Sequence, residues 1–335
     1  MKKKVSALPA ALFVCLSTMQ VSAQSDAGAA GSDEARKLNA QAVDFYKEGK
    51  NEEAVKLQKQ ALALWEKEVG EEHTLILIGS NNLGDMYRAL GRFKEAADAY
   101  QRALNIEEKL LGAENPDLAV LIIKLAWMRY GNAQVKEAEA LFKRAVAVRE
   151  KNGADDAGVA EPLLGLAAFY QKIKKPAEAV PIYWRVIAVQ EKHFGSEGQP
   201  LIETLEQCSC ALLEDKKENE AREMEHRAAL IEGKNREGPV GPIVAKEAIL
   251  QGKAIHKEQP HYPPEAMRQR ITGSVSIKIE IDEAGDVTEA KILCGGGILA
   301  AVSREAALKW RFTPTALNGQ PVKVKGILTF NFILQ

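Results

Sequence analysis

A repeat of about 42 residues organises the first two thirds of this 335-residue chain. The pair Glu-Lys, followed shortly by Gly, recurs at steps of 42, 42 and 41 residues, at Glu66-Lys67, Glu108-Lys109, Glu150-Lys151 and Glu191-Lys192. Alanines and aromatic residues keep the same spacing, at Ala54, Ala96, Ala138, Ala179 and Ala221, at Ala61, Ala103, Ala145 and Ala228, and at Tyr100, Phe142 and Tyr183. Three independent series in one register predict a solenoid, in which each unit packs against its neighbours.

The best-defined unit predicts two helices joined by a short turn. It comprises Asn82-Leu83-Gly84-Asp85-Met86-Tyr87, Gly91-Arg92-Phe93, and then Ala96, Tyr100 and Ala103. This pattern resembles the tetratricopeptide repeat, in which Gly or Ala lets antiparallel helices approach to about 8–10 Å. The usual repeat has about 34 residues, and these longer units resemble the kinesin-light-chain type. The resemblance implies about five units over residues 35–232, with degenerate units at both ends.

Most residues of such an array are expected to be scaffold, with Leu83, Tyr87, Leu125 and Leu166 in the core. The resemblance implies that any binding surface lies on the concave face, where related arrays hold an extended peptide. The candidate partner-binding residues on this face are Asn82, Asp85, Arg88, Lys124 and Trp127. The fourth unit offers only Gly165, Ala168 and Gln171 there, so a role in spacing or self-association remains open.

The pattern changes near residue 233, where glycines and prolines predict a linker over residues 233–253. Beyond it, apolar residues alternate, as expected for a strand, at Val275, Ile277, Ile279 and Ile281. A turn at residues 282–286 and a strand over residues 287–293 complete a predicted hairpin. A helix over residues 298–310 and a last strand over residues 322–334 follow.

Five short motifs accompany this strand–strand–helix–strand order. They are Tyr262-Pro263-Pro264-Glu265-Ala266, Gly273-Ser274-Val275, Gly285-Asp286-Val287, Trp310-Arg311-Phe312-Thr313-Pro314 and Gly319-Gln320-Pro321-Val322. Together they resemble the TonB C-terminal domain family over residues 254–335. The predicted fold is therefore multidomain, an all-α tetratricopeptide-type solenoid followed by a small α+β domain. Pro264 suits the first turn of a helix, and Gly285 suits a hairpin turn.

The last strand of this domain is the second candidate partner-binding element. In the TonB family it lies at a sheet edge, where unpaired backbone groups can recruit another strand. TonB domains use this edge to hold a short segment of an outer-membrane transporter. By resemblance, the candidate residues here are Val322, Lys323, Val324, Lys325, Ile327 and Thr329. The alternative is that the edge is covered within the chain or by a second copy.

The first 23 residues have the layout of a secretory signal peptide, with three lysines, an apolar segment and Val21-Ser22-Ala23 before a cleavage point. Cleavage would leave a flexible N-terminus over residues 24–34 and a periplasmic protein. An uncleaved inner-membrane anchor facing the periplasm is the alternative. Export also predicts an oxidising compartment. Cys208 and Cys210 are poorly spaced to bond each other on a helix, so these residues and Cys294 are expected to be buried free thiols.

No enzymatic site, cofactor or metal is expected. The five histidines lack metal-ligand spacing, and Gly295-Gly296-Gly297 lacks the Lys-Ser/Thr of a phosphate loop. A net charge of −1 without a basic cluster argues against nucleic acid. We expect a periplasmic adaptor that binds protein partners, one of them resembling an outer-membrane transporter segment. A TonB-type energy transducer and an assembly factor that homodimerises through the small domain remain alternatives. A transducer would need a His-bearing anchor and a proline-rich spacer, and neither is evident.

Overall fold

The computed structural model describes residues 33–234, 243–244, 254–317 and 319–334. The predicted signal peptide and most of the predicted linker lie outside these residues. The chain divides into two compact units, residues 1–169 and 170–335, with the division inside helix α7. The predicted fold class is confirmed, because helices form the whole described part up to residue 234 and a small sheet-containing domain follows.

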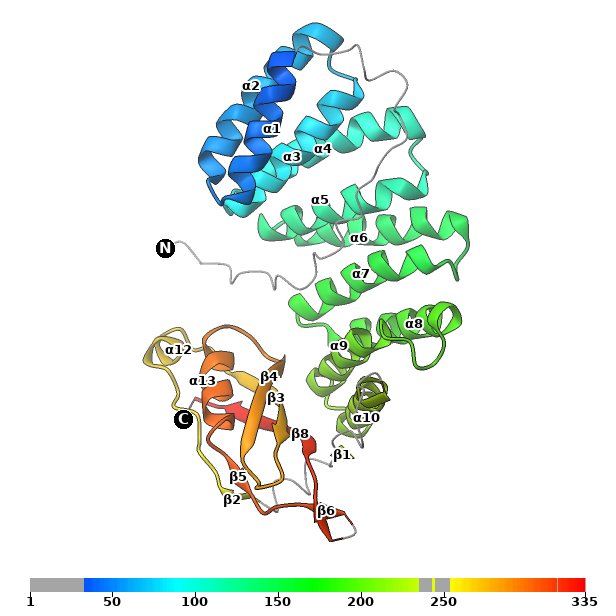
Figure 1. Ribbon diagram of the computed structural model, residues 1–335. Helices are drawn as coiled ribbons and strands as arrows, with labels where there is room; N and C mark the ends of the chain where they lie inside the picture. The colour runs from blue at the N-terminus through cyan, green and yellow to red at the C-terminus, as the bar shows by residue number, and fades with distance from the viewer. Residues whose placement is uncertain (1–32, 235–242, 245–253, 318, 335) are drawn as a thin grey trace. The chain divides into compact units, whose positions relative to one another are not determined.

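The first unit is a stack of antiparallel helices in which consecutive helices pack together from α1 to α6 (Figure 1). Short 3-10 turns η2 (Pro116–Leu118), η3 (Glu150–Asn152) and η4 (Ala157–Val159) lie between them. The helices are α1 (Asp33–Lys47), α2 (Asn51–Val69), α3 (Thr74–Ala89), α4 (Phe93–Leu111), α5 (Ala119–Gly131), α6 (Val135–Arg149) and α7 (Ala160–Lys172).

The repeated small residues and the repeated glycines each have a structural reason. All the alanines of the two series are buried, with at most 1% of their surface exposed, so a larger side chain at these positions would separate packed helices. Gly70, Gly112 and Gly195 end their helices with a positive φ of 81°, 89° and 76°. Each donates its N–H to the carbonyl of the repeated glutamate four residues earlier, a helix end for which glycine is favoured.

The repeated glutamate also joins one repeat to the next. Its carboxylate pairs with an arginine on the second helix of the following repeat, at Glu66–Arg102, Glu108–Arg144 and Glu191–Arg227. The Glu108–Arg144 pair has an N–O distance of 2.7 Å. The Glu-Lys…Gly motif therefore recurs because it combines a helix end with an ion pair between neighbouring repeats.

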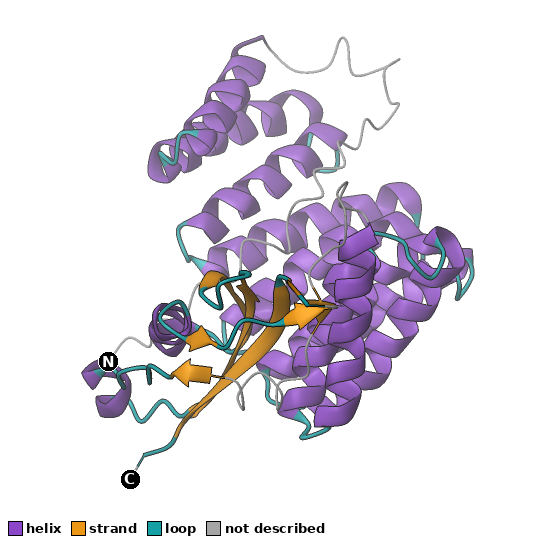
Figure 2. Cartoon of the chain, turned by 60° about the horizontal axis from the view of Figure 1, so that its bottom comes forward, coloured by secondary structure: helices purple, strands orange, loops and turns teal. Residues whose placement is uncertain are grey.

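The second unit contains helices α8 (Pro176–Phe194), α9 (Leu201–Glu214) and α10 (Glu218–Lys234) and the C-terminal domain. α8 packs on α9, and α9 packs on α10. Figure 2 shows the strands of the C-terminal domain in orange. Its main sheet has the order β1-β8-β3-β4. These strands are β1 (Ile243–Val244), β3 (Gly273–Ile281), β4 (Val287–Cys294) and β8 (Val324–Phe332).

One face of this sheet builds the core of the C-terminal domain. Val275, Ile277, Ile279 and Ile281 alternate along β3 and are at most 3% exposed, and helix α13 (Gly297–Ala307) packs against β3, β4 and β8. Trp310 and Phe312 join this core, as predicted. The smaller elements are α12 (Pro264–Arg268), β2 (Ala254–His256), β5 (Arg311–Phe312), β6 (Ala316–Leu317) and β7 (Gln320–Pro321).

Two local expectations for this domain are confirmed, and one helix is shorter than expected. Pro264 is the first residue of α12, and Gly285 has a φ of 94° in the hairpin turn. The helix predicted over residues 298–310 ends at Ala307. It ends early because the chain turns there to bring Phe312 beside the hairpin, where its N–H donates to the Gly285 carbonyl at 2.8 Å.

Candidate interaction surfaces

Four of the five predicted groove residues of the first unit make hydrogen bonds to a neighbouring repeat. Asn82 on α3 donates to Asn39 on α1 at 3.3 Å. Lys124 on α5 donates to Asn81 on α3 at 2.9 Å and to Asp85 at 3.0 Å. These polar groups hold the first helices of successive repeats in register. The side chains of Lys124 and Asp85 keep 18% and 24% of their surface exposed, so a partner could still reach them.

Arg88 extends this polar surface, whereas Trp127 does not. Arg88 donates to the hydroxyl of Tyr46 on α1 at 3.5 Å and lies 3.9 Å from Asp85. Trp127 is only 3% exposed and packs edge-to-face on Phe142, with ring centroids 5.0 Å apart. In the structure the indole of Trp127 is therefore part of the core of the third repeat.

Three residues of this surface were missed by the sequence analysis, namely Asn39, Tyr46 and Asn81. The repeat could have found Asn39, because it precedes Asn81 by one 42-residue step and so occupies the equivalent position. The bonds of Asn82 and Lys124 both reach back 43 residues and are equivalent contacts in successive repeats. In the fourth repeat the corresponding position is Gly165, which has no side chain to continue the series.

The predicted edge-strand residues lie in different environments. Val322 and Lys323 precede β8, and the side chain of Lys323 is 51% exposed. Val324 is in the core, at 2% exposed. Ile327 and Thr329 are half-buried on the opposite face of the sheet, where Thr329 lies 3.2 Å from Ser276. Lys325 shares that face, but only 8% of its side chain is exposed, and its Nζ donates to Glu232 at 2.8 Å.

Lys325 belongs to a charged cluster of the second unit, formed with Lys278, Lys291, Glu206 and Glu232. Glu206 on α9 accepts hydrogen bonds from Lys278 at 2.7 Å and from Lys291 at 3.0 Å. Glu232 on α10 accepts from Lys278 at 3.3 Å and from Lys325. Only 12% of the Lys278 side chain and 11% of the Glu206 side chain are exposed. Within the second unit, α9 and α10 therefore cover the polar face of the sheet.

Protonation of these groups follows from burial and pairing. Burial alone would raise the pKa of Glu232, but hydrogen bonding to Lys325 and the charge of Lys278 lower it to about 2. Burial would likewise raise the pKa of Glu206, and Lys278 and Lys291 lower it instead. Glu225 on α10 is different. Burial raises the pKa of Glu225 to about 7, and nearby Ser209 and Lys278 oppose this only in part.

The outer edge of β8 is a candidate site for a partner strand, as is the outer edge of β4 at the other end of the sheet. β3 pairs with β8 along its whole length, from Val324 to Phe332. On the other side, β1 pairs only with Val324 and Lys325. Among the residues that the structure describes, no strand pairs with the outer edge from Gly326 to Phe332. Unpaired backbone donors and acceptors on such an edge favour strand addition.

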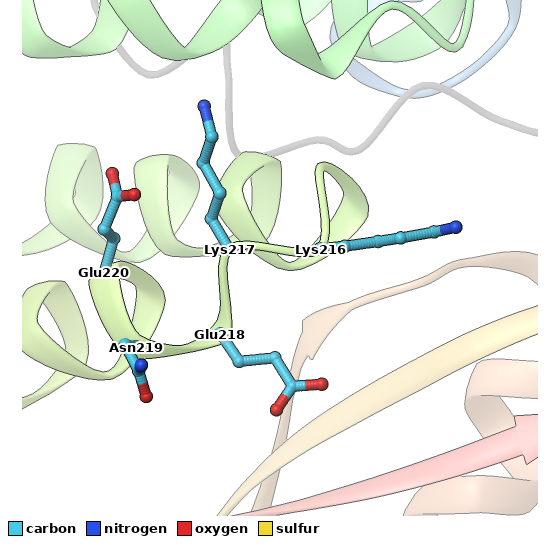
Figure 3. A pocket seen from close by; sticks show the side chains of 5 residues that line it. All are labelled: Lys216, Lys217, Glu218, Asn219 and Glu220. Carbon is cyan, nitrogen blue, oxygen red and sulfur yellow. The ribbon is translucent and has the colours of Figure 1, made fainter.

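A pocket at the turn between α9 and α10 is a weaker candidate for a binding site. It has a volume of about 340 Å³ and is lined by Lys216, Lys217, Glu218, Asn219 and Glu220. Figure 3 shows Lys217 and Glu220 pointing to one side of the turn and Glu218 and Asn219 to the other, so the side chains do not converge on a ligand. Over the described ranges, no group of three or more His, Cys, Asp or Glu side chains could hold a metal ion. None of the helices that the structure describes is long and apolar enough to span a membrane.

Comparison with protein families matches both parts of the chain. Tetratricopeptide repeat models match residues 33–108, 76–151 and 163–200. The model of the Gram-negative bacterial TonB protein C-terminal matches residues 258–334. The chain joins tetratricopeptide repeats to a TonB-type C-terminal domain. Both recognised families are confirmed, and both are interaction or transduction domains.

The similar proteins of known sequence match a short part of the chain. The protein TonB of two strains of Xanthomonas campestris pv. campestris is 31% identical over 77 residues, which is 22% of this chain and 34% of that protein. The chain thus spans about a third of the length of the curated relatives it matches.

The solved structures that resemble this chain match its repeats. A crystal structure of nearly identical TPR-like repeats, described as a kinesin light chain from Podosopora anserina, has 26% identity and a TM-score of 0.54. It covers 61% of this chain and 97% of that chain. BtubC (BKLC) from P. vanneervenii has 21% identity and a TM-score of 0.53, covers 62% of this chain and 83% of that chain, and shows the shared fold alone.

Proposed function

We propose that this chain is a periplasmic adaptor that docks a protein partner on its TonB-type domain and offers the repeat array as a second interaction surface. The observation that supports the docking site most directly is the outer edge of β8. Its backbone from Gly326 to Phe332 has no partner strand among the described residues. An extended segment of a partner protein, such as one from an outer-membrane transporter, would add there as a further strand.

The repeat array supports the second surface. Asn82, Asp85, Arg88 and Lys124 form a polar strip on the first helices, and each is already held in place by a hydrogen bond to a neighbouring repeat. Side chains that are ordered before binding lose less conformational entropy when a partner arrives. The strip carries charges of both signs and half-buried amides, so it suits an extended polar peptide rather than an apolar helix.

Site-specific photo-crosslinking on β8 tests the docking site. Asn331 is exposed near the end of β8, next to the unpaired edge. We would replace Asn331 by the photo-reactive residue p-benzoylphenylalanine, with Glu289 as the comparison position, because Glu289 is also exposed and lies on β4, the open strand at the opposite edge of the sheet. The chains would be expressed with their N-terminal segment and irradiated in cells.

The proposal predicts a crosslink to an outer-membrane protein from position 331 and none from position 289. A crosslink between two copies of the chain from position 331 would instead favour the assembly alternative. Equal crosslinking from both positions would contradict a docking site specific to the β8 edge. N-terminal sequencing of the same purified protein would distinguish a cleaved signal peptide from an anchor.

A matched pair of lysine variants tests the second surface. Lys124→Ala removes the ammonium that joins Asn81 and Asp85, whereas Lys136→Ala removes an exposed lysine of α6 outside the strip. If the strip binds a partner, Lys124→Ala weakens capture of partners by the full chain and Lys136→Ala leaves it unchanged. Equal capture by both variants would assign the strip to spacing of the repeats.

A further inference from the structure

The second unit brings together two cysteines that are far apart in the sequence. Cys210 lies on α9 and Cys294 is the last residue of β4. The structure records both as free thiols. Burial raises the pKa of the Cys294 thiol, with the neighbouring Cys210 as the next influence, and α9 packs directly against β4.

An irregularity in the sheet explains why Cys294 points toward α9. Lys278 pairs with Lys291 and Ile277 with Ile292, but Ser276 pairs with Cys294, so Leu293 is an extra residue in β4. Such a bulge changes which side chains share a face. Without the bulge, Cys294 would lie on the opposite face from Lys291. With it, Cys294 lies on the same polar face as Lys278 and Lys291.

The ion pairs of Glu206 set the register between α9 and this face. Glu206 bonds Lys291 at 3.0 Å, and Cys210 follows Glu206 by one helical turn, about 6 Å along the axis. Cys294 follows Lys291 by two paired positions, about 7 Å along the strand. The two spacings match. The ion pair between Glu206 and Lys291 therefore also places Cys210 beside Cys294.

The third cysteine of this region does not compete for either partner. Cys208 is fully buried, with none of its surface exposed. It also lies two residues from Cys210, so it faces a different side of α9. Cys210 is half-exposed, whereas Cys294 is buried. An oxidant therefore reaches Cys210 first. Cys294 is the thiol that lies close enough to attack the mixed disulfide formed on Cys210.

We propose that Cys210 and Cys294 form a disulfide that links the last repeat helices to the TonB-type domain. The oxidant is a disulfide, either a small molecule or the active-site disulfide of an oxidoreductase. The Cys210 thiolate attacks one of its sulfurs and releases the first thiol. Cys294 then attacks the Sγ of Cys210 and releases the second. The chain loses two protons and two electrons, and the oxidant disulfide becomes two thiols.

The link would preserve the docked face of the sheet when the ion pairs are weakened. The contacts of Glu206 and Glu232 with lysines are electrostatic, and protonation of these carboxylates at low pH removes them. The disulfide does not depend on charge. Formation of the bond would therefore determine whether α9 and α10 can leave the polar face of β3, β4 and β8.

Peptide mapping of the purified full chain tests the proposal. Reduced chain is incubated with oxidised glutathione, its remaining thiols are alkylated, and it is digested with trypsin without reductant. The expected product joins the peptide of residues 193–216 to that of residues 292–304, with a loss of two thiols per chain. The peptide of residues 193–216 contains both Cys208 and Cys210. In the Cys208→Ala variant it contains Cys210 alone, so a linked peptide from this variant identifies Cys210 as the partner of Cys294.

Wild type and Cys208→Ala are both expected to give the linked peptide, in monomeric chain, and Cys210→Ser is expected to give none. The wild-type result is decisive even if Cys210→Ser is poorly folded. A glutathione adduct on Cys210 without a linked peptide would overturn the proposal. A bond between Cys208 and Cys210, or a link between two chains, would overturn it as well.

Discussion

Replacing Glu225 by glutamine should stabilise the second unit at alkaline pH. The Glu225 side chain lies on α10 and is 6% exposed, and its Oε1 atom accepts no hydrogen bond. Burial raises the pKa of Glu225 to about 7 from an ordinary value of 4.5. The native carboxylate is therefore held where ionisation is unfavourable. The glutamine side chain would have nearly the same shape and no charge to bury.

The size and the sign of the effect follow from linkage between protonation and folding. Between pH 4.5 and 7 the folded state keeps a proton on Glu225 that the unfolded state has lost, so stability falls as the pH rises through this window. The difference between a pKa of about 7 and 4.5 corresponds to about 3 kcal/mol at 1.36 kcal/mol for each tenfold change. The burial of an amide in place of a protonated acid reduces the gain, so we expect about 1–3 kcal/mol at pH 8.

Urea denaturation of the full chain at pH 5 and pH 8, followed by circular dichroism, measures this difference. Glu223→Gln is the matched control, because Glu223 is on the same helix and exposed. The other titrating groups of the cluster, including Glu206 and Lys278, are present in every variant, and their contributions cancel in the comparison. Glu225→Gln should raise the free energy of unfolding at pH 8 and change it little at pH 5. An equal effect at both pH values, or a loss of stability at pH 8, would refute the reasoning.

Two further substitutions test the packing of the repeats and the charged cluster. Gly84→Ala should lower the free energy of unfolding by about 1 kcal/mol in a urea titration. The new Cβ would lie 2.5 Å from a ring carbon of buried Tyr100, and this overpacking outweighs the helix preference of alanine. A gain in stability would contradict this packing. Glu232→Gln should cost about 1–3 kcal/mol at pH 7, because it leaves Lys325 without the carboxylate that accepts its hydrogen bond. The pKa of Glu232 is lowered to about 2. The extra stability of the wild type over the variant should therefore disappear as the pH falls from 4.5 to 2. If the free energies of unfolding of the two chains fell in parallel over this range, the pairing would be contradicted.

The recurrent sequence motifs predicted the architecture because their physical causes are local. A helix pair needs small residues where its helices cross, and Ala96 and Ala138 are accordingly buried. A helix end needs a residue that tolerates positive φ, and Gly70 and Gly112 supply it. Each requirement recurs once per repeat, so it appears in the sequence as a spacing. The short motifs around Pro264 and Gly285 behave in the same way, because they encode one turn each.

The candidate surfaces were less predictable, because the role of a polar residue depends on its neighbours. In the sequence, Trp127 shares the first-helix surface pattern with Lys124. In the structure, however, the Trp127 indole packs edge-to-face on Phe142 in the core. Lys325 belongs to the predicted edge strand, yet its side chain is buried against Glu232. Alternation along a strand predicts that two faces exist. It does not predict which of them another element will cover.

The repeat period and the ordered motifs of the C-terminal domain determined that the chain is a helical solenoid followed by a TonB-type α+β domain. The tertiary structure decided which distant residues meet. The extra residue Leu293 turns Cys294 toward α9, and Glu206 bonds two lysines more than 70 positions away in the chain. No spacing in the sequence records these contacts, because they arise from one bulge and one docked helix pair and not from a repeated local rule.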